Sequence, residues 1–121
     1  MVSESFAEKM VMCSTDFDSN VDEFEISGLN PIASDRINPP RLLESKVSFE
    51  CELNQIVEIG NSDAGSGFIV IGTVLLFHID DEVYENGHIL IDKLEPIGRL
   101  AGNKYTRPSD VFEISRKIKP E

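Results

Sequence analysis

Two long apolar segments, at residues 47–59 and 68–79, constrain the fold of this chain more than any other feature of its sequence. In the first segment apolar and polar side chains alternate, which predicts a strand with one buried face, as in antiparallel sheets. One face of that strand is predicted to consist of Val47, Phe49, Cys51, Leu53, Gln55, Val57 and Ile59. The second segment is apolar on both faces, which predicts a central strand that needs cover on both sides. Residues 60–67, rich in glycine, are predicted to join the two strands as a hairpin loop.

The predicted strands are too few for their length. At about 3.3 Å per residue, strands of about 12–13 residues span roughly 40 Å, a length typical of barrels and strongly coiled sheets. Residues 89–98 add a short strand or a helical turn that Pro96 ends, and residues 111–114 suggest one last short strand around Val111, Phe112 and Ile114. A lone hairpin is marginally stable in water, so further strands must come from a second subunit or from residues upstream of Met1. We therefore expect the isolated chain to aggregate or to be an obligate oligomer.

Short helices are predicted ahead of the sheet. The first is indicated by a capping-box spacing, Ser5-x-x-Glu8, with apolar residues following at helical intervals. A second helix is predicted to begin at the cap Ser19 and to stop at Gly28. Three prolines interrupt residues 29–45, which are predicted to form an extended loop. The fold class expected from these elements is mainly β with short helices.

Composition excludes several classes of function. A length of 121 residues suits one domain, and a net charge of −11 argues against a nucleic-acid surface. The longest apolar run, Phe68–Phe77, falls well short of the roughly 18–20 residues that span a bilayer, so no membrane insertion is expected. The N-terminus lacks the features of a signal peptide, and two cysteines without a CxxC motif favour a reducing compartment. These observations predict a cytoplasmic protein.

A compact cationic turn, rich in glycine, follows the predicted hairpin. Its members are Gly98, Arg99, Gly102, Lys104, Tyr105 and Arg107. A plain turn needs glycine or asparagine but neither arginine nor tyrosine, whereas a site that closes over an anionic, planar ligand would use all of them. Charge is also uneven: residues 1–35 hold one basic and eight acidic residues, and residues 93–121 hold seven basic and four acidic ones. The basic end could neutralise an anionic ligand or the acidic face of a second subunit; the alternative is a solvated acidic face with a basic tail.

Five stretches, taken in order, resemble the flavin reductase-like family of FMN-binding split-barrel proteins. They are DEFEISGL (22–29), PPRLLES (39–45), FECEL (49–53), FIVIGTVLLFHIDDEVY (68–84) and LEPIGRLAGNKYT (94–106). The chain departs from the family pattern at Ala101-Gly102, where the family has two glycines, and within residues 10–15, where an expected asparagine is replaced. The resemblance implies an antiparallel, here partial, FMN-binding split β-barrel. It also implies a homodimer that binds FMN and transfers electrons from NADH or NADPH to flavin or to a partner.

The resemblance also implies that residues 1–121 are the C-terminal portion of such a domain. Family members usually begin with a further N-terminal portion that holds the first barrel strands and much of the flavin contact surface. Its absence here would account for the shortage of strands noted above. Two functions therefore stay open: an FMN-dependent reductase, and a non-catalytic remnant that only dimerises or binds flavin weakly. A small binding module of another class, using the acidic face, is a distant third.

Three flavin contacts are implied on the cationic turn. Arg99 would contact the phosphate or a pyrimidine carbonyl or hold the loop around the flavin, the alternative being an ion pair with Glu95 or Asp92. Gly102 would allow close approach of the backbone, although a tight turn alone explains it. Tyr105 would stack on the ring or bind the ligand through its hydroxyl, the alternative being a packed residue at the edge of the core.

Three further contacts are implied elsewhere. His78, predicted to lie on the face of Phe68, Val70, Val74 and Leu76, would lie near the site or else be a histidine at the edge of the core. Ser14 and Thr15 would contact the flavin edge or else form the last turn of the first helix. No catalytic side chain is expected, because hydride acceptance is the cofactor's chemistry. No metal site is expected either, since the acids at residues 80–82 lack EF-hand spacing.

Overall fold

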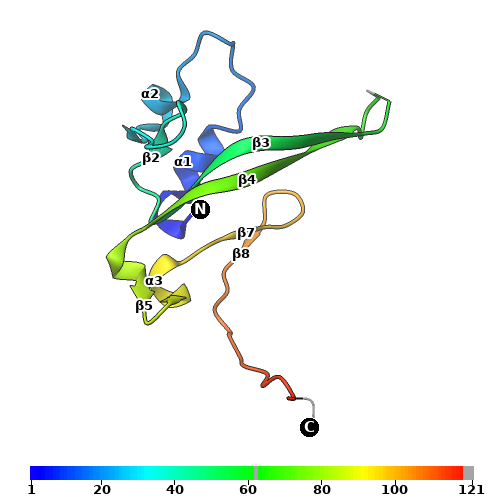
Figure 1. The fold of residues 1–121 in the computed structure, drawn as a ribbon. Helices are drawn as coiled ribbons and strands as arrows, with labels where there is room; N and C mark the ends of the chain where they lie inside the picture. Colours follow the sequence, from blue (N-terminus) through cyan, green and yellow to red (C-terminus); the bar gives the residue numbers. More distant parts are fainter. Residues whose placement is uncertain (62, 119–121) are drawn as a thin grey trace.

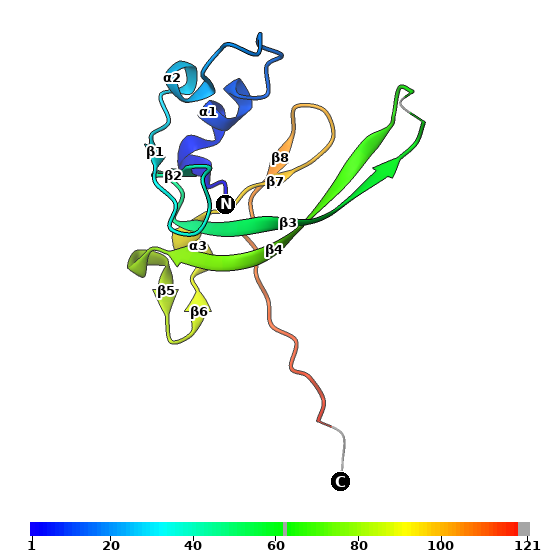
Figure 2. The same cartoon turned by 45° about the horizontal axis from the view of Figure 1, so that its top comes forward.

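The computed structural model describes residues 1–61 and 63–118. A long antiparallel hairpin dominates it, formed by β3 (Val47–Ile59) and β4 (Gly67–Ile79). This hairpin projects away from the helices in both ribbon views (Figures 1 and 2). The predicted pair of long strands is therefore confirmed, while Ser62 in the predicted connecting loop lies outside the described residues.

Three further antiparallel ladders are short and separate from the long hairpin. They are β1 (Pro31–Ile32) with β2 (Arg41–Leu42), β5 (Tyr84–Glu85) with β6 (His88–Ile89), and β7 (Gly98–Arg99) with β8 (Tyr105–Thr106). The helical elements are equally short: η1 (Glu4–Phe6), α1 (Ala7–Met12), α2 (Glu23–Ser27), η2 (Asp81–Val83) and α3 (Ile91–Leu94). Among the described residues, none of these helices has the length and apolar character needed to cross a bilayer.

The helix starts differ from those predicted. Within residues 1–61 and 63–118, the structure has no hydrogen bond of the kind that a Ser5–Glu8 capping box would form. The first helical element, η1, instead follows Ser3, whose hydroxyl donates to the Leu94 carbonyl at 2.6 Å. Helix α2 begins after Asp22 rather than Ser19, because the Asp22 carboxylate accepts from the Phe24 N–H at 2.9 Å. A carboxylate at that position caps the first turn and also suits the helix dipole.

The stop of the second helix is confirmed. Gly28 follows α2 with φ +63°, the left-handed conformation that ends many helices and that glycine adopts without steric cost. The Lys9 ammonium donates to the Gly28 carbonyl at 2.7 Å, which joins the end of α2 to α1. The two helices therefore pack as one small lobe beside the sheet (Figure 1).

Two bulges change which side chains share a face of the β3–β4 hairpin. The register shifts between Glu50 and Cys51 and again between Leu53 and Gln55. Beyond the second shift Ile56 pairs with Val70, which places Ile56 on the face of Leu53 where Gln55 was predicted. At the first shift, β4 contains one residue more than the paired part of β3. His78 therefore lies on the face of Leu76 and opposite the face of Phe68, Val70 and Val74, so the predicted grouping was wrong in part.

The buried core is small and lies at the base of the hairpin. Val47, Val83 and Leu94 form its centre, with Ile89 packed against them. The N-terminus is bound to the same region, because the Met1 ammonium donates to the Val47 carbonyl at 2.5 Å and the Glu4 N–H donates to the Glu95 carbonyl at 2.9 Å. The first residues of the chain therefore lie beside the segment that leads to β7.

One apolar face of the hairpin is open to solvent. Among the described strands β3 and β4 pair only with each other, so β4 is not the central strand that its composition predicts. Six large side chains on one face are about half exposed or more. These residues, called here the open sheet face, are Phe49 (49%), Leu53 (63%), Ile56 (52%), Phe68 (68%), Val70 (66%) and Phe77 (59%).

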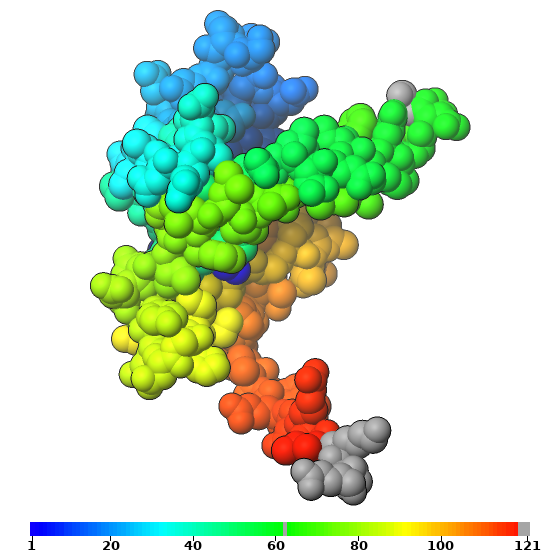
Figure 3. All heavy atoms as spheres, viewed as in Figure 1, coloured from blue at the N-terminus to red at the C-terminus, as the bar shows by residue number. Residues whose placement is uncertain are grey.

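The last predicted strand does not form. Residues 107–118 run as an extended tail in which Val111, Phe112 and Ile114 are 67–83% exposed. Figure 3 shows this tail and the tip of the hairpin projecting from the body of the molecule. Apolar composition suggested a strand there, but no described strand pairs with these residues, and a strand needs such a partner for its backbone hydrogen bonds.

Candidate functional site

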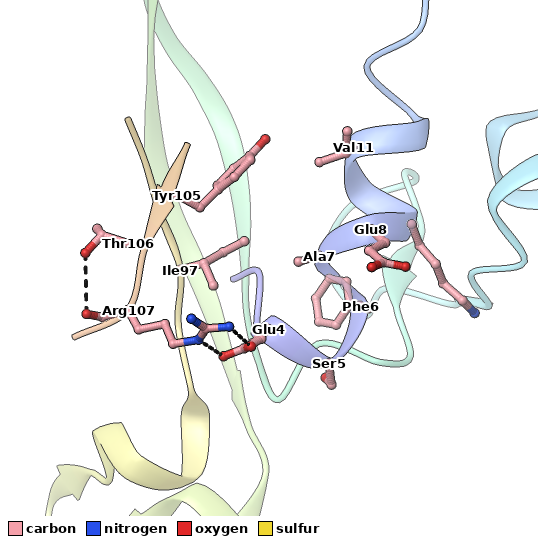
Figure 4. Close-up of a pocket in the computed structure, with 11 residues that line it drawn as sticks. Glu4, Ser5, Phe6, Ala7, Glu8, Val11, Ile97, Tyr105, Thr106 and Arg107 are labelled. Carbon is pink, nitrogen blue, oxygen red and sulfur yellow. Dashed lines mark hydrogen bonds and ion pairs between the residues drawn. The ribbon is translucent and has the colours of Figure 1, made fainter. Parts of the chain in front are cut away.

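A cavity of about 750 Å³, called here the Tyr105 cavity, opens between α1 and the β7–β8 hairpin. Phe6 and Val11 line it from the helical side, and Ile97 and Tyr105 face them from the other side (Figure 4). The remaining lining residues are Ser5, Ala7 and Thr106, together with the charged residues Glu4, Glu8, Lys9 and Arg107. Its volume lies within the range of about 300–1,000 Å³ typical of small-molecule sites.

The β7–β8 hairpin brings together three of the residues predicted from sequence. The Arg99 guanidinium carbon lies 5.0 Å from the centre of the Tyr105 ring, a cation–π contact. No ion pair of Arg99 with Glu95 or Asp92 occurs among the residues that the structure describes. Gly102 has φ +63° in the turn that joins the two strands, which explains the glycine there by backbone conformation. Arg99 thus contacts the very ring that lines the cavity.

Ser14 and Thr15 follow the end of α1, one turn beyond the cavity residue Val11. The Ser14 hydroxyl donates to the Val11 carbonyl at 2.6 Å, and the Thr15 N–H donates to the Met12 carbonyl at 3.2 Å. Both residues are exposed. This geometry is that of a helix-terminal turn, the structural alternative for the two residues, and their contact with a ligand stays a prediction.

His78 belongs to a different part of the molecule. Its Nε2 atom lies 2.5 Å from Glu50 Oε1 and 3.9 Å from Asp35 Oδ2. It is not among the residues that line the Tyr105 cavity. The structure therefore brings Arg99, Gly102 and Tyr105 together but leaves His78 apart from them.

Glu50 is the centre of a buried polar cluster that sequence reasoning missed. Its side chain is fully buried, and its two oxygens accept the N–H groups of Asp35 at 2.9 Å and Arg36 at 2.7 Å. The Arg41 Nε atom lies 3.6 Å from Glu50 Oε1 and is buried without a hydrogen-bond partner. Through these hydrogen bonds Glu50 holds the loop at residues 35–36 against the sheet.

The same contacts keep Glu50 ionised. Burial alone would raise the pKa of this carboxyl, but the Asp35 N–H, the His78 ring and the Arg36 N–H together lower it from 4.5 to about 2. Asp35, Glu50 and His78 offer three ligand atoms within 4.8 Å of one another. Because the Glu50 oxygens already accept two backbone N–H groups and face the Arg41 cation, the cluster is better suited to holding the loop than to holding a metal ion.

An ion pair closes one side of the Tyr105 cavity. The guanidinium of Arg107, just after β8, donates two hydrogen bonds to the two carboxylate oxygens of Glu4 in η1 (Figure 4). Hydrogen bonding from Arg107 lowers the pKa of Glu4 below its ordinary value. A second cavity, of about 760 Å³, is also lined by Glu4 and Arg107, and three further acids, Asp92, Glu95 and Glu113, line it. The ion pair is thus part of the wall of both cavities.

Known proteins resemble this chain in fold and in part of its sequence. A model of the flavin reductase like domain family matches residues 1–96. An uncharacterized protein of Aquifex aeolicus (strain VF5) is 38% identical over 108 residues, which cover 88% of this chain and 53% of that protein. The crystal structure of nitrilotriacetate monooxygenase component B from Bacillus cereus has a TM-score of 0.86 at 30% identity, covering 94% of this chain and 57% of that one. A split-barrel domain protein from Shewanella frigidimarina NCIMB 400 has a TM-score of 0.79 at 22% identity, covering 96% and 58%. The chain thus spans about half the length of the proteins it matches.

Proposed function

Because this chain belongs to the flavin reductase-like domain family, whose split-barrel fold it shares, we propose that it binds FMN in the Tyr105 cavity. We propose further that it transfers electrons from NADH or NADPH to flavin or to a protein partner. One observation carries the proposal: the cavity joins an aromatic and apolar wall to charged residues that include the cations Lys9 and Arg107 and the acids Glu4 and Glu8. A flavin nucleotide needs both, since it combines a planar ring system with an anionic phosphate.

The roles of the β7–β8 residues follow from their positions. Tyr105 lines the cavity and is 37% exposed, so its ring offers a platform on which a flavin ring can stack. Arg99 contacts that ring and fixes its orientation, which makes Arg99 a positioning residue in this proposal. Gly102 lets the turn close tightly beside the platform. We propose that Ser14 and Thr15, which follow the cavity residue Val11, contact an edge of the ligand.

The chemistry of the proposed site would come from its cofactor. Bound FMN supplies hydride acceptance and one-electron transfer, so no acid or base of the protein is required. The chain's own part is to bind and orient the ring and to exclude water from its apolar side, using Phe6, Ile97 and Tyr105. His78 lies in the Glu50 cluster, where its ring contacts the Glu50 carboxylate.

The open sheet face favours a homodimer. Six large apolar side chains on one two-stranded sheet form a larger exposed patch than isolated surface residues explain, and such patches commonly mark interfaces. We propose that a second copy of the chain covers this face through a two-fold interface, in the cytoplasm. The same exposed face also favours a second function, that of a non-catalytic module which dimerises or binds flavin weakly.

Replacement of Tyr105 tests the proposed site. We expect Tyr105→Leu to weaken FMN binding about tenfold, because base–aromatic and ring–aromatic stacking is worth about 1–3 kcal/mol. The measurement is quenching of flavin fluorescence during a titration of FMN with each protein. Tyr84→Leu is the matched control, since Tyr84 lies on β5, is 49% exposed and is not a lining residue of the cavity. Equal affinities in the two variants would place the flavin elsewhere.

A further inference from the structure

Two cations line the Tyr105 cavity, and they are engaged differently. Lys9 donates to the Gly28 carbonyl, a neutral partner that orients the ammonium without cancelling its charge. Arg107 is engaged by the Glu4 carboxylate, and both side chains are well solvated, at 69% and 41% exposure. Glu8 lines the same cavity, so two acids balance two cations there. The charges that line the cavity therefore attract an anion only if one of the acids no longer pairs with its cation.

The Glu4–Arg107 pair is suited to such an exchange. A guanidinium binds carboxylate and phosphate with the same two-pronged geometry, so one anion can replace the other on Arg107. A phosphate monoester carries about 1.5–2 negative charges at pH 7 against one for a carboxylate, which favours the phosphate. Because ion pairs between exposed side chains contribute little to stability, breaking the pair costs little.

We propose that Arg107 holds the phosphate of FMN in the Tyr105 cavity and that Glu4 is the built-in carboxylate which this phosphate displaces. This inference rests on the proposed function and adds the subsite that distinguishes FMN from riboflavin. The second cavity is the less favourable place for the phosphate, because Asp92, Glu95 and Glu113 line it.

The test compares FMN with riboflavin, which lacks the phosphate, on three variants at low ionic strength. Arg107→Gln is expected to weaken FMN about tenfold and riboflavin less than about twofold, the size of effect expected for loss of a charged hydrogen-bonded pair. Glu4→Gln is expected to tighten FMN about threefold and to leave riboflavin unchanged, because the competitor is lost. Lys104→Gln removes one positive charge from the β7–β8 hairpin, three residues before Arg107, at a residue that does not line the cavity, and it should change either affinity less than about twofold.

The outcomes separate this inference from the proposed function. If the unmodified chain binds neither flavin, the proposed function fails and the phosphate subsite fails with it. If it binds both flavins but Arg107→Gln affects FMN no more than Lys104→Gln does, only the subsite is overturned. Equal losses for FMN and riboflavin in Arg107→Gln, or weaker FMN binding in Glu4→Gln, would also overturn it. Thermal unfolding of each variant should match that of the parent, because the pair is exposed.

Discussion

We expect Val70→Lys to turn the proposed dimer of this chain into a monomer. Val70 lies near the middle of the open sheet face, is 66% exposed and pairs with Ile56 across the hairpin. In a two-fold interface the same patch meets itself, so each dimer would bury two unpaired ammonium groups among apolar side chains. We expect the dimer dissociation constant to rise at least about 100-fold, which corresponds to about 2.7 kcal/mol.

Sedimentation velocity over a range of concentrations measures this effect. Gln55→Lys is the matched control, because Gln55 lies on the opposite face of the same hairpin and gains the same charge. The control is expected to keep the association of the parent chain. A parent chain that sediments as a monomer with cooperative unfolding, or a Val70→Lys variant that associates as the parent does, would contradict the assignment of the open sheet face as a dimer interface.

Glu50→Gln is expected to lower the thermal unfolding midpoint at pH 7 by roughly 10 °C, the scale for removing one partner from a buried charged network. The amide introduced by this substitution can accept only through its oxygen, so its NH₂ group faces either the Asp35 or the Arg36 N–H, and Arg41 loses its carboxylate. Glu52→Gln is the control, since Glu52 is an exposed residue on the same strand and should change the midpoint little.

The effect of Glu50 should depend on pH in a defined direction. The pKa of Glu50 is lowered in the folded chain, from 4.5 to about 2, so its stabilising contribution is fully present above about pH 4.5 and is lost as the pH falls toward 2. The difference in midpoint between the parent and Glu50→Gln should therefore shrink over this window. Glu4 and Glu44, whose pKa values are also lowered, occur in both proteins and cancel in the comparison. A difference that stays constant from pH 7 to pH 2 would rule out this role for Glu50.

Local patterns in the sequence predicted the elements whose causes are local. Alternation of side chains at residues 47–59 and the glycine-rich loop indicated the hairpin, and Gly28 marked a helix end. The quoted motifs led to the family, which the comparisons confirm. Arg99, Gly102 and Tyr105 were found together because they lie within seven residues of one another, and the structure places them on one hairpin.

Features that depend on long-range contacts could not be predicted. A β-bulge arises from the pairing of two strands and leaves no sign in the alternation of one strand. The sequence pattern therefore assigned Ile56 and His78 to the wrong faces relative to their neighbours. Arg107 and Glu4 form an ion pair although they are 103 positions apart in the sequence, and no periodic pattern relates residues at that separation. Glu50 looked like one polar residue of an alternating strand, and only the fold brings the 35–36 loop over it.

Titration of the purified 121-residue chain with FMN, followed by quenching of flavin fluorescence, tests the proposed flavin site most directly. We expect saturable binding of one FMN per chain with a dissociation constant of about 1 μM or tighter. A sample that unfolds cooperatively, and is therefore folded, but leaves FMN fluorescence unchanged at concentrations far above this value would contradict it.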